Sequence, residues 1–132
     1  MALDPGTVRI GVAVSDSARS MAFPRPYVPA GPSALADCAR IVREESVSLV
    51  VVGSPRTLDG ERREAAAGAA EFAAALGAAL EGDGVEVVLH DERLTTRTAS
   101  ARLREAGVSS RDARERVDGA AAAVLLEAWL AT

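Results

Sequence analysis

The sequence predicts an α/β domain with a mixed central sheet and helices on both faces. Short β-branched runs without a helical stripe alternate with longer, alanine-rich helical segments, as they do in α/β proteins. A turn beside the first long run predicts a hairpin, whereas the later runs are separated by helices and predict parallel crossovers. The length of 132 residues and the 48% hydrophobic composition suit a single domain, 1–132, with one active site.

Three runs carry the clearest strand signal. Residues 8–15 (VRIGVAVS) and 47–53 (VSLVVVG) are β-branched runs typical of buried strands, and 85–90 is a third. The turn DPGT at 4–7 precedes the first run; its proline fixes one dihedral angle and its glycine supplies the freedom for positive φ. Only residues 2–3 remain as strand before Asp4, so we expect a very short central strand that ends at this residue.

The remaining segments predict an edge strand and four helices. Prolines are so frequent over 20–31 that only a short edge strand followed by a loop is expected there. A helix should begin after Ser33, a suitable N-cap, and end near Glu45. Three more helices are expected at 61–80, 95–106 and 111–130, and glycines at 82–84 and 107 should end the first two of these.

The composition excludes several kinds of site. Cys38 is the only cysteine and His90 the only histidine, so neither a cysteine zinc cluster nor a mechanism that needs two imidazoles is available. We expect Cys38 to pack as a small hydrophobe. Strand alternation should turn His90 away from Asp91 and from any metal site. The sequence shows neither a membrane span nor a secretion signal, so a cytoplasmic location without membrane contact is expected.

The charge pattern leaves nucleic-acid binding open. The net charge is −4, whereas nucleic-acid-binding domains often carry a basic face. All 15 basic residues are arginine, which contacts phosphate in a bidentate manner, and local groups of them could form a basic rim around an acidic centre. Codon bias explains an alanine-rich, lysine-free chain equally well. The groups are Arg56, Arg62 and Arg63; Arg93, Arg97, Arg102 and Arg104; and Arg111, Arg114 and Arg116.

Three acidic residues occupy positions where a globular domain has little reason to place a carboxylate. Asp4 and Glu92 each follow a strand, and open α/β sheets present ligands at strand ends. Asp118 lies on a helical stripe that should pack against the sheet, where a carboxylate is costly unless it is paired or binds metal. The other members of that stripe are Ala122, Leu125 and Trp129.

Each of these acids also has a purely structural explanation. Asp4 can be a turn former, and the acids at 91–92 can cap the next helix or balance Arg93. Asp118 can form a salt bridge to Arg114 or Arg93. If the three acids converge instead, with Asp91 assisting, oxygen-only ligation favours Mg²⁺ or Mn²⁺ over zinc. Two such ions about 4 Å apart promote phosphodiester hydrolysis.

Four segments, in order across nearly the whole chain, resemble the YqgF/RuvX family: ALDPGTVRIGVAVSD, VVVGSPRTLDG, DERLTT and VDGAAAAVLL. The resemblance implies a ribonuclease-H-like fold related to the Holliday-junction resolvase RuvC. It also implies a divalent-metal-dependent nuclease that matures the 5′ end of pre-16S rRNA in ribosome biogenesis. The motif acids of the family fall on Asp4, Glu92 and Asp118.

The resemblance also implies a substrate groove beside the loop after the second buried strand. Gly53, Pro55, Asp59 and Gly60 match that loop. Related proteins carry several more strand residues before the DPGT motif, so the first strand of this chain should be a stub. The resemblance to RuvC implies a site of four carboxylates, whereas this chain offers three clear acids and one ambiguous neighbour. Resolvase activity is therefore a weaker expectation than nuclease activity. The residues expected to contact nucleic acid are Arg56, Arg62, Arg63, Arg93, Arg97 and Thr7.

Three functions therefore stand as hypotheses. The first is an RNA-processing nuclease that acts on pre-rRNA or precursor ribosomal particles. The second is a resolvase that cuts branched DNA as a homodimer, and the third is a non-catalytic nucleic-acid-binding assembly factor. Among the few aromatic residues, Phe72 and Trp129 should be core, while Tyr27 in its expected loop is open to base stacking, self-association or no role.

Overall fold

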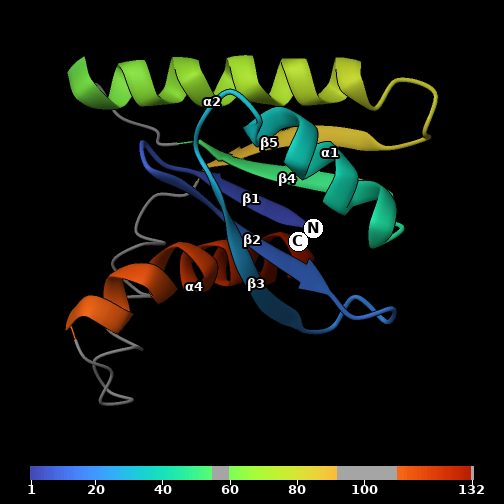
Figure 1. Ribbon diagram of the computed structural model, residues 1–132. Helices are drawn as coiled ribbons and strands as arrows, with labels where there is room; N and C mark the ends of the chain where they lie inside the picture. Colours follow the sequence, from blue (N-terminus) through green and yellow to red (C-terminus); the bar gives the residue numbers. More distant parts are fainter. Residues whose placement is uncertain (55–59, 92–109, 132) are drawn as a thin grey trace.

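The computed structural model describes residues 1–54, 60–91 and 110–131 (Figure 1). The predicted helix at 95–106 and the loop at 55–59 fall outside these ranges. No helix in the described part has the length and apolar character needed to cross a membrane. In chain order the elements are β1 (Ala2–Pro5), β2 (Arg9–Ser15), β3 (Ala22–Pro29), α1 (Ala34–Glu44), β4 (Leu49–Ser54), α2 (Gly60–Ala79), β5 (Glu86–Asp91) and α4 (Ser110–Leu130).

The five strands form one mixed sheet in the order β3-β2-β1-β4-β5. β1 pairs antiparallel with β2, and β2 pairs antiparallel with β3. β4 is parallel to β1, and β5 is parallel to β4. The hairpin followed by parallel crossovers is thus confirmed, and β1 is the central strand. Parallel order brings the carboxyl ends of β1, β4 and β5 to one edge of the sheet.

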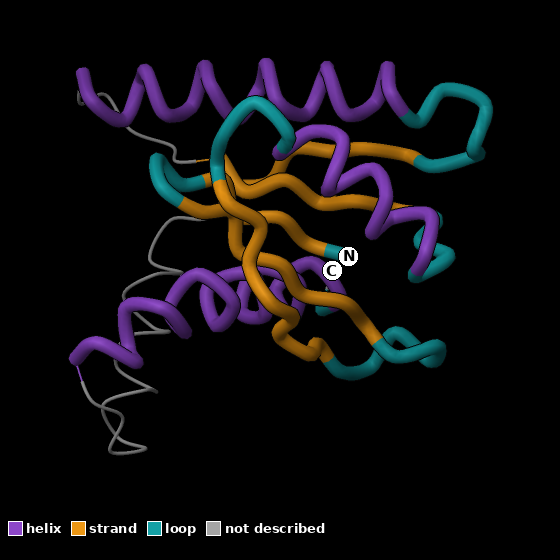
Figure 2. Tube along the Cα trace, viewed as in Figure 1, coloured by secondary structure: helices purple, strands orange, loops and turns teal. Residues whose placement is uncertain are grey.

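Helices cover both faces of this sheet, as Figure 2 shows. α1 and α2 lie on one face, over a core that includes Leu3 and Val52. α4 lies on the other face, over a core that includes Ala2 and Val51. Successive strand residues therefore serve opposite cores, because side chains alternate across a strand. Residues two positions apart in a strand therefore lie on the same face of the sheet.

β1 is only four residues long, yet it is held on both sides. The Met1 amino group donates a hydrogen bond to the Leu49 carbonyl at 3.0 Å, and the Val51 amide donates one to the Met1 carbonyl at 2.8 Å. Ala2 and Leu3 are fully buried. The expected short central strand is confirmed, and backbone pairing with two neighbours compensates for its length.

β3 differs from its prediction. It runs for eight residues along the edge of the sheet rather than as a short strand followed by a loop, and it contains Tyr27. An edge strand pairs on one side only, so a proline whose nitrogen faces away from β2 removes no hydrogen bond from the ladder. The register shifts between Ile10 and Val12, which marks a β-bulge.

The helix ends are only partly as expected. Ser33 is the residue before α1, but its side chain makes no capping hydrogen bond, because its backbone is already helical at φ −92° and ψ −3°. α2 is followed by Gly82 and Gly84 at φ +89° and +71°, conformations that favour glycine. Cys38 in α1 is fully buried, as predicted.

Candidate active site

Asp4 is the centre of the candidate site. It lies near the carboxyl end of the central strand and is 8% exposed, which makes it the one buried charged side chain among the residues whose burial is described. Ala2 packs beneath α4, so alternation places Asp4 on the same face. Burying a carboxylate is costly unless the group is paired, hydrogen-bonded or bound to a metal.

The strand register shows what lies level with Asp4. Ala2 pairs with Val51 and Leu3 with Val52, so the next residues along the two strands are Asp4 and Gly53, and Gly53 pairs with His90 of β5. The chain leaves β5 after Asp91, which pairs with Ser54, the last residue of β4. Asp91 therefore ends its strand at the edge where Asp4 lies. Glu92 is the next residue in the sequence and falls outside the described residues.

The third predicted acid, Asp118, lies in α4. The prediction that its stripe packs on the sheet is confirmed for Ala122 and Leu125, which are buried, and for Trp129, which is partly buried against the same core. α4 runs opposite to β1, so its first half lies toward the edge at which β1 ends (Figure 1). The side chain of Asp118 is outside the described part, and its convergence with Asp4 stays a prediction.

The turn between β1 and β2 depends on glycine, but for another reason than predicted. Gly6 does not have positive φ; the described glycines that do are Gly82 and Gly84. Instead, the Gly6 amide donates to the Arg9 carbonyl at 3.0 Å, and a Cβ on Gly6 would lie 2.7 Å from that oxygen. Close backbone approach therefore selects glycine here. Thr7, a predicted phosphate contact, is exposed in this turn.

His90 does not turn away from the site as the sequence suggested. Its ring meets Trp129 of α4 edge to face, with centroids 5.6 Å apart and planes at 85°. His90 therefore lies on the α4 face, which is also the face of Asp4. Two-residue alternation from Val88, which packs on the core beneath α4, gives the same result.

Most of the predicted phosphate-binding arginines have side chains outside the described part of the structure. Arg56, Arg93 and Arg97 fall outside the described residues. Arg62 and Arg63 belong to the first turn of α2, and their side chains are not described either. α2 follows β4 in the chain, so it begins on the side of the sheet where β4 ends (Figure 1). Their proposed contacts with phosphate remain predictions.

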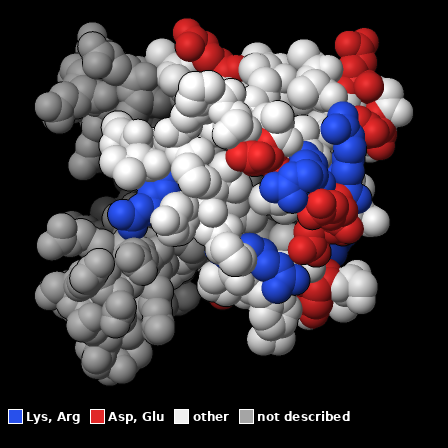
Figure 3. Space-filling model, in the orientation of Figure 1, with Lys and Arg blue, Asp and Glu red and all other residues white. Residues whose placement is uncertain are grey.

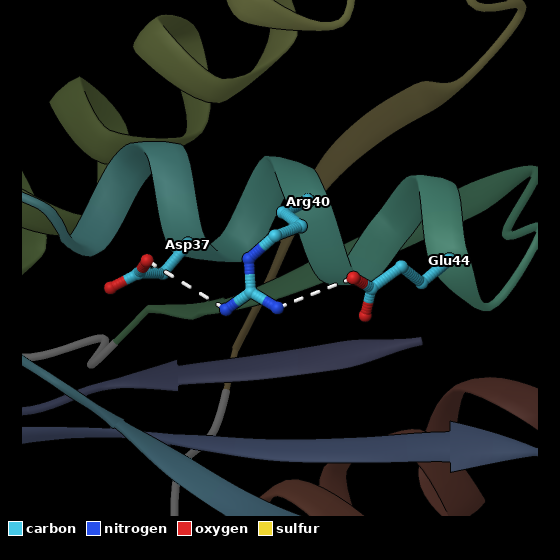
Figure 4. Close-up of polar contacts among 3 residues, drawn as sticks. All are labelled: Asp37, Arg40 and Glu44. Atoms are coloured by element: carbon cyan, nitrogen blue, oxygen red, sulfur yellow. Dashed lines mark hydrogen bonds and ion pairs between the residues drawn. The ribbon is translucent and has the colours of Figure 1, made fainter.

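On the right of the face shown in Figure 3, arginines and acids are interleaved over α1 and β3. Arg40 lies 3.8 Å from Asp37 and 3.3 Å from Glu44 in adjacent turns of α1 (Figure 4). Two further ion pairs join Arg43 with Asp83 at 3.2 Å and Arg25 with Glu45 at 3.6 Å. Acids neutralise these cations, so this face is a mixed-charge surface rather than a basic patch.

Arg9 of β2 and Tyr27 of β3 form a second pair of contacting side chains. The guanidinium carbon of Arg9 is 5.2 Å from the centre of the Tyr27 ring, within the range of a cation–π contact. Arg9 begins β2 directly after the turn, and Ala13 of the same strand packs under α4, so alternation puts Arg9 on the face of Asp4. The pair was not predicted, because Tyr27 was expected in a loop, whereas β3 pairs Arg9 with Pro29 and so places Tyr27 diagonally opposite Arg9.

The fit of a divalent cation can be judged at Asp4. A buried carboxylate supplies the oxygen ligand that Mg²⁺ and Mn²⁺ prefer. No group of three possible metal ligands occurs among the side chains that the structure describes, and that set lacks Glu92, Asp91 and Asp118. Asp4 thus fits the predicted metal, while the other ligands stay predicted.

Comparisons with known proteins agree on one family. Residues 1–132 match the RuvX family, described as Holliday junction resolvase. A protein of Rhodococcus opacus (strain B4) named "Putative pre-16S rRNA nuclease" is 46% identical over 134 residues, which is 97% of this chain and 74% of the relative. One of the same name from Anaeromyxobacter sp. (strain Fw109-5) is 43% identical, over 98% of this chain and 94% of the relative.

Two solved structures of Thermus thermophilus RuvC share the fold. The complex with Holliday junction substrate matches with a TM-score of 0.59 and 16% identity, covering 98% of this chain and 94% of that one. A second RuvC structure matches with a TM-score of 0.51. These likenesses confirm the ribonuclease-H-like fold. The match along the whole sequence and the close relatives together show that the chain belongs to the RuvX family.

Proposed function

We propose that this protein is a divalent-metal-dependent endonuclease that hydrolyses phosphodiester bonds. The observation that carries the proposal is the buried Asp4, at the edge of the sheet where β5 leads into Glu92. Asp4, Glu92 and Asp118 are the proposed metal ligands and catalytic residues, and Asp91 assists them. The nuclease names of the relatives and the family description support this assignment.

The proposed substrate is the precursor of 16S rRNA in the cytoplasm, either as free RNA or within precursor ribosomal particles. Its support is the name shared by relatives that are 41% to 46% identical to this chain. The family description favours a second candidate, a Holliday junction cut by a homodimer. Cleavage of either substrate needs the same phosphodiester chemistry. The two functions are therefore distinguished by which substrate is cleaved and not by the residues of the site.

The residues of the chain have distinct tasks in this proposal. Mg²⁺ or Mn²⁺, when bound, would supply charge neutralisation and activation of water. Asp4 offers a ligand oxygen from a strand that is paired on both sides, and such rigid support keeps a ligand in place. Arg56, Arg62, Arg63, Arg93, Arg97 and Thr7 are the proposed contacts to the phosphate backbone.

A cleavage assay with matched variants tests the proposal. Purified protein is given labelled pre-16S rRNA or a labelled four-way junction, with Mg²⁺, Mn²⁺ or EDTA. We expect Asp4→Asn to lower metal-dependent cleavage on the order of 100-fold or more while the protein stays folded, because a ligand charge is lost without a change of shape. Asp37→Asn, which alters an aspartate of α1 paired with Arg40, is the control and should cleave normally.

The outcomes separate the three functions. Cleavage of the rRNA alone supports the RNA nuclease, and cleavage of the junction alone supports the resolvase. Binding without cleavage at any metal concentration would overturn the nuclease proposal in favour of an assembly factor. Equal cleavage by the wild type and by Asp4→Asn would place the catalytic centre elsewhere.

A further inference from the structure

A row of three residues crosses the sheet from Asp4 to its edge. Asp4 of β1 pairs with Gly11 of β2. On the other side of Gly11, the paired positions jump from Arg25 to Val28 of β3, so Pro26 and Tyr27 both stand opposite this glycine. Neighbouring strands are about 4.8 Å apart, which puts the backbone of Tyr27 roughly 10 Å from that of Asp4.

The middle of this row has no side chain, because residue 11 is glycine. The extra residue at 26–27 is a bulge, and bulges next to active sites commonly redirect a side chain. Nothing on β2 at this level therefore stands between the carboxylate of the central strand and the aromatic residue of the edge strand. Gly11 is itself buried, so a ligand reaches Asp4 and Tyr27 around the row, at the edge of the sheet where β1 ends and where Arg9 begins β2.

The outer end of the row combines a cation with an aromatic ring. Tyr27 is 45% exposed, so its ring keeps open surface although the Arg9 guanidinium lies 5.2 Å from its centre. Base stacking on an aromatic ring together with charge pairing to phosphate is how proteins hold single strands. Arginine suits both tasks, because its plane stacks and its fork binds phosphate.

We propose that Arg9 and Tyr27 form a binding site for one nucleotide of a single-stranded segment beside the scissile bond. The base stacks on Tyr27 and the adjacent phosphate pairs with Arg9. The inference rests on the proposed nuclease function and adds that the enzyme selects unpaired strand next to its cut.

A stacked duplex does not offer this contact, because its bases are already covered by their neighbours. Recognition of single-stranded RNA relies on splayed bases that stack on aromatic side chains. The competing possibilities are a packing role within the hairpin of β2 and β3 and a contact between two copies of the chain. The experiment below distinguishes all three.

Binding is measured without cleavage, by fluorescence anisotropy in EDTA with labelled 12-nucleotide RNA, the same DNA sequence, and the RNA duplex. We expect Tyr27→Leu to weaken single-strand binding about 5- to 100-fold, as loss of one base–aromatic stack does, and Tyr27→Phe to restore it. Phe23→Leu is the matched control: Phe23 is 42% exposed on the same strand, but it pairs with Val14, which serves the opposite core.

Charge is tested in parallel. Arg9→Gln should weaken binding and lower the slope of log affinity against log salt by about one, because one phosphate contact is lost. Arg40→Gln removes the same charge from α1, which covers the opposite face of the sheet from Asp4, and should leave the slope unchanged. Thermal unfolding of each variant shows whether it is folded.

The inference is overturned if folded Tyr27→Leu binds single strands as well as Phe23→Leu does, or if it weakens duplex binding equally. A change confined to the sedimentation of the protein would also overturn it and indicate self-association. These results do not touch the nuclease proposal, which depends on cleavage by the wild type and its loss in Asp4→Asn. Conversely, if the protein cleaves neither substrate but its binding depends on Tyr27, the nuclease proposal is refuted and the Arg9–Tyr27 binding site is supported.

Discussion

His90 and Trp129 meet edge to face, with ring centroids 5.6 Å apart. One ring comes from the carboxyl end of β5 and the other from the last turns of α4. These are the two elements to which the proposed ligands Glu92 and Asp118 are attached. The contact therefore joins the last turns of α4 to the strand that leads into the candidate site.

Removing either ring should loosen that docking. Trp129 is partly buried, so we expect Trp129→Ala to lower the free energy of unfolding by about 2–3 kcal/mol, less than a fully buried tryptophan would cost. A double-mutant cycle with His90→Ala should give a coupling of about 0.5–1.5 kcal/mol. Urea unfolding followed by circular dichroism measures both values. Strictly additive effects would show that the two rings do not stabilise one another.

Gly6→Ala should damage the hairpin that carries Asp4. The new Cβ would lie 2.7 Å from the Arg9 carbonyl oxygen, which is backbone and cannot swing aside. We expect a loss of about 1–3 kcal/mol in stability, together with weaker metal-dependent cleavage. Gly31→Ala is the matched control, because nothing lies within 4 Å of its Cβ, and it should change stability by less than about 0.5 kcal/mol. Equal stability of the two variants would refute the close-approach explanation.

Two helical glycines offer the opposite result. Gly68 and Gly77 lie within α2, and a Cβ on either meets nothing within 4 Å. Alanine restricts the unfolded chain more than glycine does, so each substitution should raise the free energy of unfolding by about 0.5–1 kcal/mol. Differential scanning calorimetry checks this as a higher melting temperature. A lower melting temperature would mean that α2 needs glycine for a contact beyond the described residues.

Cys38 should be chemically silent in the folded protein. Burial, with a smaller effect of Asp37, raises the pKa of its thiol from 9.0 to about 12. The thiolate is the reactive form, so iodoacetamide at pH 8 should label the protein in urea and spare it in buffer. The raised pKa also means that the native state keeps a proton that the unfolded chain releases. Stability should therefore fall as pH rises above about 9.

The three-residue network in Figure 4 should contribute little to stability. Arg40 bridges Asp37 and Glu44, but its side chain is 59% exposed, and water and salt screen such pairs. We expect Arg40→Ala to change the free energy of unfolding by less than about 1 kcal/mol, and by still less in 0.5 M salt. Chemical unfolding at two salt concentrations tests this. A large loss that persists in high salt would indicate packing by the arginine stem instead.

Most of the fold follows from local patterns in the sequence. Buried runs such as 49–54 are hydrophobic on both faces, because helices cover the sheet on each side, and this signal survives without any tertiary information. β3 was under-predicted for the opposite reason. Its prolines are read locally as strand breakers, whereas their tolerance depends on the position of the strand at the edge of the sheet, which is set by the whole topology.

The candidate site divides in the same way. The position of Asp4 near the end of the central strand was predictable, because the DPGT turn that begins with this residue is conspicuous in a single sequence. The approach of Arg9 to Tyr27 was not, because it depends on the pairing of Arg9 with Pro29 in β3, a strand that the prolines hid from the sequence. The role of Gly6 was predicted for the wrong reason, since close contact and positive φ both select glycine and the sequence alone does not separate them.

The prolines of β3 have a consequence for how the molecule behaves in a crowded solution. Residues 24, 26 and 29 lack an amide hydrogen, and they lie along the rim of the sheet. A strand from another molecule that paired with this edge would find no amide hydrogen-bond donor at these positions of β3. Edge-to-edge pairing of sheets from different molecules is therefore disfavoured at β3. The exposed aromatic residues of this strand add little tendency to aggregate.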